Sequence, residues 1–348
     1  MKMSSVIPLL CGTIPVLADQ SIPTEHPQVL DSFYPQLKNG DNAWGLVDLL
    51  YFSVHERRVV MTNKNTNLFT TADITKKPII HPHLENNFGY RLGTGYIFSK
   101  RKWDVAVNWT HFNTDAHQKR STHHDISRGM FPLWSLADDI LPYDWVEEAE
   151  MHWELDLNLV DLDFGYALDW GKLFFLRPYA GLRSAWIDQD FDVSYSGGIF
   201  VNGLNLPALE SSCGPDKVHM KNNFWGLGPQ LGIEPQMTLG KGWRIYGNAC
   251  GTLEYGVFSL RQKETYLETA RYHRHRHPWR FRWIIDAGAG ILWKTYCASD
   301  RLALTFKLGW EYHIFFDQME LKGDKFDLIS DNRNLVLNGA AFSARIDF

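Results

Sequence analysis

The sequence contains no long hydrophobic run. Nowhere in its 348 residues does it reach the ~18 or more consecutive apolar residues that a membrane-spanning helix needs. The mean hydropathy is -0.28. This excludes a helical membrane protein and leaves either a soluble β-protein or a membrane β-barrel, because lumen-facing polar residues dilute the hydropathy of barrel strands.

Cysteine is also scarce, with four residues in the whole chain. Three of them, Cys213, Cys250 and Cys297, follow the N-terminal segment. A sparse, odd set is not a disulfide framework, so we expect free thiols. The net charge of -5 argues against a nucleic-acid partner. No segment indicates a cofactor.

The N-terminus resembles a secretory signal. Lys2 precedes a mostly apolar segment from Val6 to Leu17, and Ala18 ends a small-residue cleavage site. We therefore expect a signal peptide over residues 1–18, the alternative being a buried N-terminal strand or helix. Residues 19–43 have prolines and no periodicity, which predicts an irregular periplasmic or plugging segment.

From residue 44 to 348, apolar and polar residues alternate with a period of two, which predicts β-strands. The clearest case is Leu302–Phe316, where every even position is large and apolar. The chain ends in the same way, at the terminal aromatic Phe348. The alternating stretches begin near Trp44, Phe88, Trp103, Met151, Phe174, Trp225, Trp243, Phe281, Leu302 and Leu335.

Short and long connections alternate strictly between these stretches. The short ones are Ser99–Lys102, Asp169–Lys172, Thr238–Gly242 and Cys297–Asp300. The long ones are Glu56–Asn87, Asn113–Glu150, Ser196–Asn223, Arg261–Trp279 and Asp317–Asn334. Short periplasmic turns and long extracellular loops are typical of outer-membrane barrels. We therefore predict an all-β fold, a transmembrane antiparallel β-barrel of about ten strands, with both termini on the periplasmic side.

Two details refine this prediction. The alternation changes phase near Leu159 and Val160, which predicts a β-bulge there. Tryptophans cluster near the strand ends, as expected for two aromatic girdles. The periplasmic girdle would contain Trp44, Trp103, Trp170, Trp243 and Trp293, and the extracellular one Trp153, Trp186, Trp225, Trp283 and Trp310. A soluble β-sandwich or barrel with these aromatics inside is the alternative.

Several segments resemble the Legionella-type major outer membrane protein family, which also occurs in chlamydia-like bacteria. They are Phe88–Tyr96, Trp103–Val105, Trp109–Phe112, Val160–Gly165 and Leu176–Arg183. The resemblance extends from about residue 44 to the C-terminus and implies a pore-forming outer-membrane protein. The few cysteines differ from the cross-linked chlamydial porins.

The predicted lumen is densely charged. We expect it to be lined by Arg91, Asp104, Asn108, Asp163, Arg177, Arg183, Arg244, Glu254, Arg282, Asp286, Lys307, Glu311 and Arg345. These charges could set the selectivity of a channel. Alternatively they form ion pairs that fill a narrow barrel, since about eight strands are already nearly filled by side chains. Asp163 is expected directly opposite Arg177 or diagonal to it.

Two long loops carry unusual residues. Adjacent His123 and His124, with Asp138 and Asp139, could mimic the Asp/His chemistry of ten-stranded omptin-like proteases. A metal site is less expected there, because adjacent histidines rarely converge on one ion. The second loop, Arg271–Arg280, is strongly basic. Its Arg271, Arg274, Arg276 and Arg280 could bind a polyanion, and its histidines would add charge on acidification.

The sequence therefore predicts an outer-membrane barrel of a Gram-negative-type bacterium. We expect a porin-like passive diffusion channel or a structural outer-membrane protein, not an enzyme. An adhesin or surface antigen is the alternative, and an omptin-like hydrolase a more distant one. The expected partners are membrane lipid, lipopolysaccharide, a host-surface polyanion, and the barrel assembly machinery through Phe348.

Overall fold

A computed structural model describes residues 32–38, 40, 42–56, 59–64, 79–80, 85–98, 101–122, 130–134, 143–197, 199–200, 215–266, 269–298, 300–321 and 333–348. The expected signal peptide, His123, His124, Asp138, Asp139 and Cys213 lie outside the described residues. Among the described residues, no helix has the length and hydropathy of a helical membrane span.

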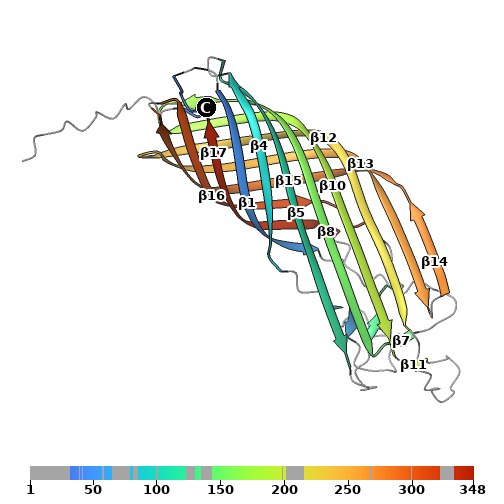
Figure 1. The fold of residues 1–348 in the computed structure, drawn as a ribbon. Coiled ribbons are helices and arrows are strands. Elements are labelled where there is room, and N and C mark those ends of the chain that lie inside the picture. The colour runs from blue at the N-terminus through green and yellow to red at the C-terminus, as the bar shows by residue number, and fades with distance from the viewer. Residues whose placement is uncertain are drawn as a thin grey trace, which may run out of the picture.

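The chain folds into a closed antiparallel barrel of ten strands (Figure 1). β17 closes the barrel against β1, and β12 pairs with β13 on the other side. The barrel strands are β1 (Asn42–Glu56), β4 (Asn87–Phe98), β5 (Trp103–Ser121), β8 (Glu148–Tyr166), β10 (Phe174–Ser196), β12 (Asp216–Gly240), β13 (Trp243–Tyr266), β15 (Trp279–Cys297), β16 (Leu302–Phe315) and β17 (Leu335–Asp347). The predicted fold class is confirmed.

Shorter strands complete the structure. β9 (Leu168–Trp170) pairs with β10, and β14 (Thr269–Arg276) pairs with the extracellular end of β13. Two small sheets are not hydrogen-bonded into the barrel sheet. One contains β2 (Thr62–Lys64), β3 (Ile79–Ile80) and β6 (Met130–Pro132), and the other β7 (Tyr143–Trp145) and β11 (Ile199–Phe200).

The strands differ greatly in length, so one wall of the barrel is much taller than the other. β12 has 25 residues and β13 has 24, whereas β4 has 12 and β17 has 13. β5, β8, β10, β12, β13 and β14 continue together beyond the ends of β4, β16 and β17 (Figure 1). We call this projecting wall the extension. The prediction that residues 113–150, 196–223 and 261–279 are loops is therefore wrong over much of their length.

The change of alternation on β8 marks where the extension begins. Thr110 pairs with Leu159 and Trp109 with Val160, and the register advances one residue at a time through this region. The predicted bulge is absent. Odd residues face inward throughout, and they change from apolar Leu157 and Leu159 to acidic Asp161. The inward and outward faces thus exchange their polarity at this point, while the backbone geometry of the strand continues unchanged.

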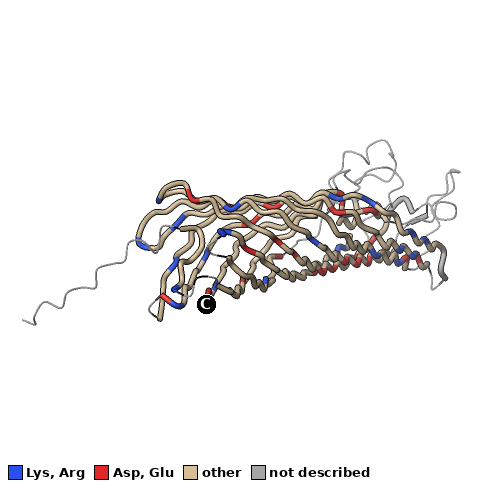
Figure 2. Tube along the Cα trace, turned by 90° about the horizontal axis from the view of Figure 1, so that it is seen from above, with Lys and Arg blue, Asp and Glu red and all other residues tan. Residues whose placement is uncertain are grey.

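This inversion separates lipid from water. In the lower barrel, apolar side chains such as Leu231, Leu308 and Phe342 are exposed on the outside. Beyond Trp109, Trp186 and Trp225 the outward residues of the tall strands are polar, and charged residues follow the strands of the extension (Figure 2). The exposed belt therefore matches the hydrocarbon region, and the extension projects above it.

Most of the predicted girdle tryptophans lie on the outer surface near the expected ends of the belt, but two do not. Trp44 is buried inside the periplasmic end, where the Arg345 guanidinium lies 4.2 Å from its ring centroid. Trp153 is buried inside the extension. Both lie on the inward face of their strands, because burial alternates along β1 and β8.

The inversion predicts that a charge is costly on the outer face only within the belt. Leu308→Arg should destabilise the barrel by about 2–4 kcal/mol, because it places a guanidinium in hydrocarbon. Asn113→Arg, on the outer face of β5 above the belt, should change the free energy of unfolding by less than about 0.5 kcal/mol. Urea unfolding in phospholipid vesicles measures both. Similar losses of unfolding free energy for the two variants would contradict a belt that ends below Asn113.

Candidate functional site

The outer half of the lumen is filled by apolar side chains. One continuous cluster of buried residues joins nine of the ten barrel strands with residues 59–61, 130–134 and 319–321. Its large members include Phe52, Phe112, Trp134, Trp153, Phe191, Phe224, Phe258 and Phe315. We call this the apolar cluster. The Trp134 indole N–H donates to the Val60 carbonyl at 2.6 Å, which attaches the covering segments to each other.

The periplasmic end is crossed by residues 32–38, which we call the strap. Arg244 donates to the Ser32 carbonyl at 2.9 Å, and Lys294 donates to the Phe33 carbonyl at the same distance. Phe33 and Tyr34 are buried with side chains from opposite walls, including Trp44 and Phe175. The strap belongs to the segment that the sequence predicts to be irregular and either periplasmic or plugging, and a plugging role stays a prediction.

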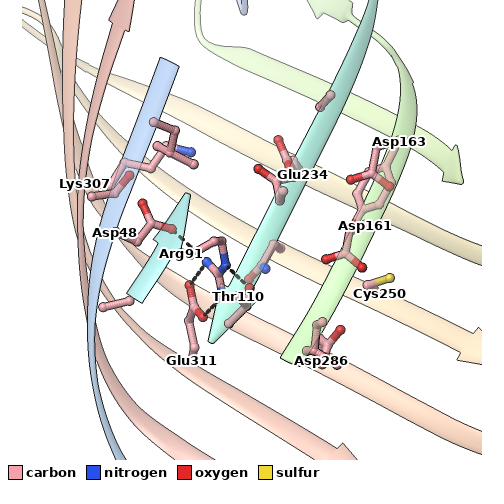
Figure 3. Close-up of a pocket in the computed structure, with 18 of the residues that line it drawn as sticks. Asp48, Arg91, Thr110, Asp161, Asp163, Glu234, Cys250, Asp286, Lys307 and Glu311 are labelled. Atoms are coloured by element: carbon pink, nitrogen blue, oxygen red, sulfur yellow. Dashed lines mark hydrogen bonds and ion pairs between the residues drawn. The ribbon is translucent and has the colours of Figure 1, made fainter. Parts of the chain in front are cut away.

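A cavity of about 190 Å³ lies between the apolar cluster and the strap. Phe52, Phe112 and Phe315 border it on the extracellular side, and Phe33 and Tyr34 on the periplasmic side. Charged residues from nine barrel strands line the space between them. This cavity is the candidate site (Figure 3).

The charges of the cavity form a continuous line across the barrel. Arg183 contacts Asp161 through two nitrogens, at 2.6 and 3.1 Å, and reaches across the lumen to Asp286. His313 lies between Asp286, at 2.8 Å, and Glu311, at 3.1 Å.

Arg91 on β4 connects this line to Asp48 on β1. It donates to Glu311 at 2.8 and 3.1 Å and to Asp48 at 2.9 Å, as Figure 3 shows. We call the whole line, Asp161–Arg183–Asp286–His313–Glu311–Arg91–Asp48, the charge line. It connects β8, β10, β15, β16, β4 and β1.

Arg177 forms a second centre nearer the strap. It contacts Asp104 through two nitrogens at 2.9–3.1 Å, and Glu234 at 3.2 Å. Asp163, which was expected near Arg177, instead lies opposite Gly181 and accepts a hydrogen bond from Gln230. That prediction was wrong because the register places Asp161, not Asp163, opposite the nearest arginine, Arg183.

The arrangement favours structure over chemistry. Both ring nitrogens of His313 contact carboxylate oxygens, which only accept hydrogen bonds when ionised. The ring therefore donates from both nitrogens and has no free lone pair with which to act as a general base. Among the described residues, no group of His, Cys, Asp and Glu could hold a metal ion. Cys250 and Cys297 are free thiols.

Most of the lumen residues expected from the sequence come together here. Arg91, Asp104, Asn108, Asp163, Arg177, Arg183, Asp286, Lys307, Glu311 and Arg345 line the cavity. Three others lie elsewhere inside the barrel. Arg244 holds the strap, Glu254 is buried in the wall, and Arg282 pairs with Glu320 near the extracellular rim.

The list also omitted essential partners. Asp48 was hidden in a stretch of β1 that is apolar on both faces, because Leu50 and Phe52 already belong to the apolar cluster. His313 and Glu234 stood on the polar faces of their strands but had no feature that marked them. Tyr34 lies in a segment without periodicity, where pattern analysis has no signal.

The basic segment 271–280 is a strand for most of its length and not a loop. β14 pairs with β13, so alternate residues face opposite sides. The Arg271 side chain lies outside the described residues. Arg274, Arg276 and Arg280 line a second, smaller cavity at the extracellular rim.

Comparison with known proteins identifies the family. A family model described as Legionella pneumophila major outer membrane protein precursor matches residues 41–348. No curated protein matches the chain. Among solved structures, the chain is similar to the outer membrane protease OmpT from Escherichia coli, with 9% identity, a TM-score of 0.35, and coverage of 89% of this chain and 97% of that one. A Pseudomonas aeruginosa FadL homologue matches with 8% identity, a TM-score of 0.26, and coverage of 89% and 90%. Such low identity carries no information on activity.

The charge line predicts which cavity cation matters for stability. Arg183→Met should cost about 3–5 kcal/mol, because it leaves Asp161 and Asp286 buried without their partner. Lys307→Met is the matched control, since Lys307 also lines the cavity but has no ion pair among the described residues and lies 5.4 Å from the Tyr246 ring centroid. Denaturant titration followed by tryptophan fluorescence compares them. Equal losses would show that the charge line is not a stabilising element.

Proposed function

Because the chain belongs to the Legionella pneumophila major outer membrane protein family, we propose that it is a structural outer-membrane protein with a closed lumen. Its barrel anchors the extension and displays that wall above the outer leaflet. Location in the outer membrane follows from the family and the barrel. The closed lumen and the display role are the proposed parts.

The apolar cluster is the observation that supports a closed lumen. A passive diffusion channel needs a continuous water-filled path, as in the wide porin barrels. Here the cluster contains buried side chains from nine of the ten barrel strands and from the covering segments. Trp134 of one covering segment packs with its ring centroid 5.3 Å from that of Phe191 on β10, and the Tyr195 hydroxyl donates to the Met61 carbonyl at 2.8 Å. Opening a path would expose many buried aromatic side chains to water, each at a cost of about 1.5–3 kcal/mol.

The charges below the cluster also support a structural role. Selectivity filters use charges that are available to a permeating solute. Arg91, Arg177 and Arg183 are instead each bound to two carboxylates of the barrel wall. Their guanidinium groups are engaged in bracing the wall.

The outer face of the extension supports display. His117, His152, Asp192, His219 and Lys263 lie directly opposite one another on five neighbouring strands. Cross-strand neighbours of opposite charge stabilise this face, as in the His117–Glu150 contact at 2.9 Å. That hydrogen bond, with Lys119 nearby, lowers the pKa of Glu150. The extension thus presents a rigid, charged surface to the extracellular medium.

A gated channel is the second candidate, and the polar cavity above the strap favours it. If the strap left the periplasmic end, the cavity would open to that side. The strap is held largely by hydrogen bonds to its backbone from Arg244 and Lys294, which need no particular strap sequence.

Conductance in planar lipid bilayers distinguishes the two candidates. We expect no current steps from the intact protein, because the apolar cluster blocks the outer half of the lumen. We expect the same from the variant Phe33→Ala with Tyr34→Ala, which loosens only the strap. Heat-modifiable migration on gels provides the control that both proteins are folded barrels.

Two outcomes would contradict the proposal. Regular current steps from the intact protein would establish a diffusion channel. Steps from the strap variant alone would establish the gated channel.

A further inference from the structure

A small cavity at the extracellular rim is surrounded by arginines. Its volume is about 120 Å³, and Arg274, Arg276 and Arg280 line it together with Gln262 and Glu320. Leu260, Pro278 and Leu321 complete the lining. We call this cavity the rim notch. It shares no lining residue with the candidate site, although β15 contributes to both, with Arg280 in the rim notch and Asp286 in the charge line.

Strand pairing brings the arginines together. Arg274 lies opposite Gln262 and Arg276 opposite Leu260. Gln262 and Leu260 are buried on the inward face of β13, so Arg274 and Arg276 share that face. His273 and His275 occupy the opposite, outward face. Arg280 follows after the break at Pro278, at the start of β15.

The rim notch has more positive than negative charge. Glu320 is the one carboxylate among its lining residues, and it already pairs with Arg282. The Arg280 Nε lies 3.9 Å from the same carboxylate. Among the described residues, no carboxylate forms an ion pair with Arg274 or Arg276. Three guanidinium groups around a small pocket suit a compact, doubly charged oxyanion, which each can bind through two N–H groups.

The level of the notch indicates which oxyanion is available. Trp279, Phe281 and Trp283 are exposed on the outer face of β15, and Tyr255 stacks beside them with ring centroids 5.2 Å from Trp279 and 4.8 Å from Phe281. Such aromatic residues mark the level of the lipid headgroups. Arg280 lies between Trp279 and Phe281 in the chain and therefore at this level.

The barrel wall is also one strand short here. Pairing between β15 and β16 begins at Ile284 and Phe315, so residues 279–282 have no β16 partner among the described residues. Residues 316–321 border this flank in place of a strand, since Phe316 donates its N–H to the Trp283 carbonyl at 3.0 Å and Glu320 pairs with Arg282. A lipid phosphate beside the barrel could approach the notch over this flank.

We propose that Arg274, Arg276 and Arg280 bind a phosphate group of lipopolysaccharide in the outer leaflet. This site is independent of whether the lumen conducts. For this site we expect binding to weaken at low pH, whereas the histidines of the segment had suggested that binding would strengthen. The histidines face away from the notch, and desolvation together with neighbouring His277 and Arg261 lowers the pKa of His275. A phosphate monoester loses its second charge below about pH 6, so binding weakens on acidification.

The test measures binding of the full-length barrel to bisphosphorylated lipid A in detergent micelles. The variant carries Arg274→Ser, Arg276→Ser and Arg280→Ser. The matched control carries Lys217→Ser, Arg261→Ser and Lys263→Ser, three exposed cations on the outward face of the neighbouring strands β12 and β13. We expect the variant to bind at least about tenfold more weakly than the intact protein, and the control to bind within about threefold.

Two further ligands, dephosphorylated lipid A and heparin, test whether the bound anion is a lipid phosphate or a sulfated polyanion. We expect little binding of dephosphorylated lipid A, and weaker binding of lipid A at pH 5.5 than at pH 7.5. Equal binding by variant and control, or retained binding of dephosphorylated lipid A, would overturn the site. Arginine-dependent binding of heparin without binding of lipid A would overturn the assignment to lipid. If the triple variant does not fold, Arg276→Gln alone, at an exposed side chain, gives the same comparison.

Discussion

The rest of the structure depends on the way charges are buried in the lumen. A charge taken out of water is costly unless a partner and further hydrogen bonds compensate it. The charge line meets this requirement with alternating signs from Asp161 to Asp48, and each cation contacts two anions. Because its members come from six strands on both sides of the lumen, the line also fixes the distance between opposite walls.

Glycine makes room for this network. A Cβ at Gly165 would collide with both Asp104 and Arg177, so the second ion-paired centre can form only beside a residue without a side chain. Gly181, opposite Asp163, has the same relation to the Asp163 carboxylate. Gly165 and Gly181 are thus spaces for large charged neighbours and not breaks in the strands. This explains why a glycine-rich inward face coexists with a filled lumen.

The period of two, together with the alternating short and long connections, was sufficient to predict the barrel and its ten strands, because backbone geometry fixes that period whatever surrounds the strand. The period alone could not predict whether the inward or the outward face of a strand is apolar, since that depends on whether lipid or water surrounds the barrel at that level. On β8 the inward residues change from apolar Leu159 to acidic Asp161 without a change in register. Trp153 was placed on the wrong face for this reason. Long-range partners such as Arg183 and Asp286, 103 residues apart, also leave no local signal.

The inverted polarity explains how a single sheet can serve two environments. Within the belt, lipid solvates the outer face, so the polar residues turn inward and must pair with one another. Above the belt, water solvates the outer face, so the apolar residues turn inward and form a core like that of a soluble barrel. The two interiors meet at Phe52, Phe112 and Leu159, where the apolar cluster borders the charged cavity. A strand that crosses the membrane surface must change its pattern there, and the same change closes the lumen.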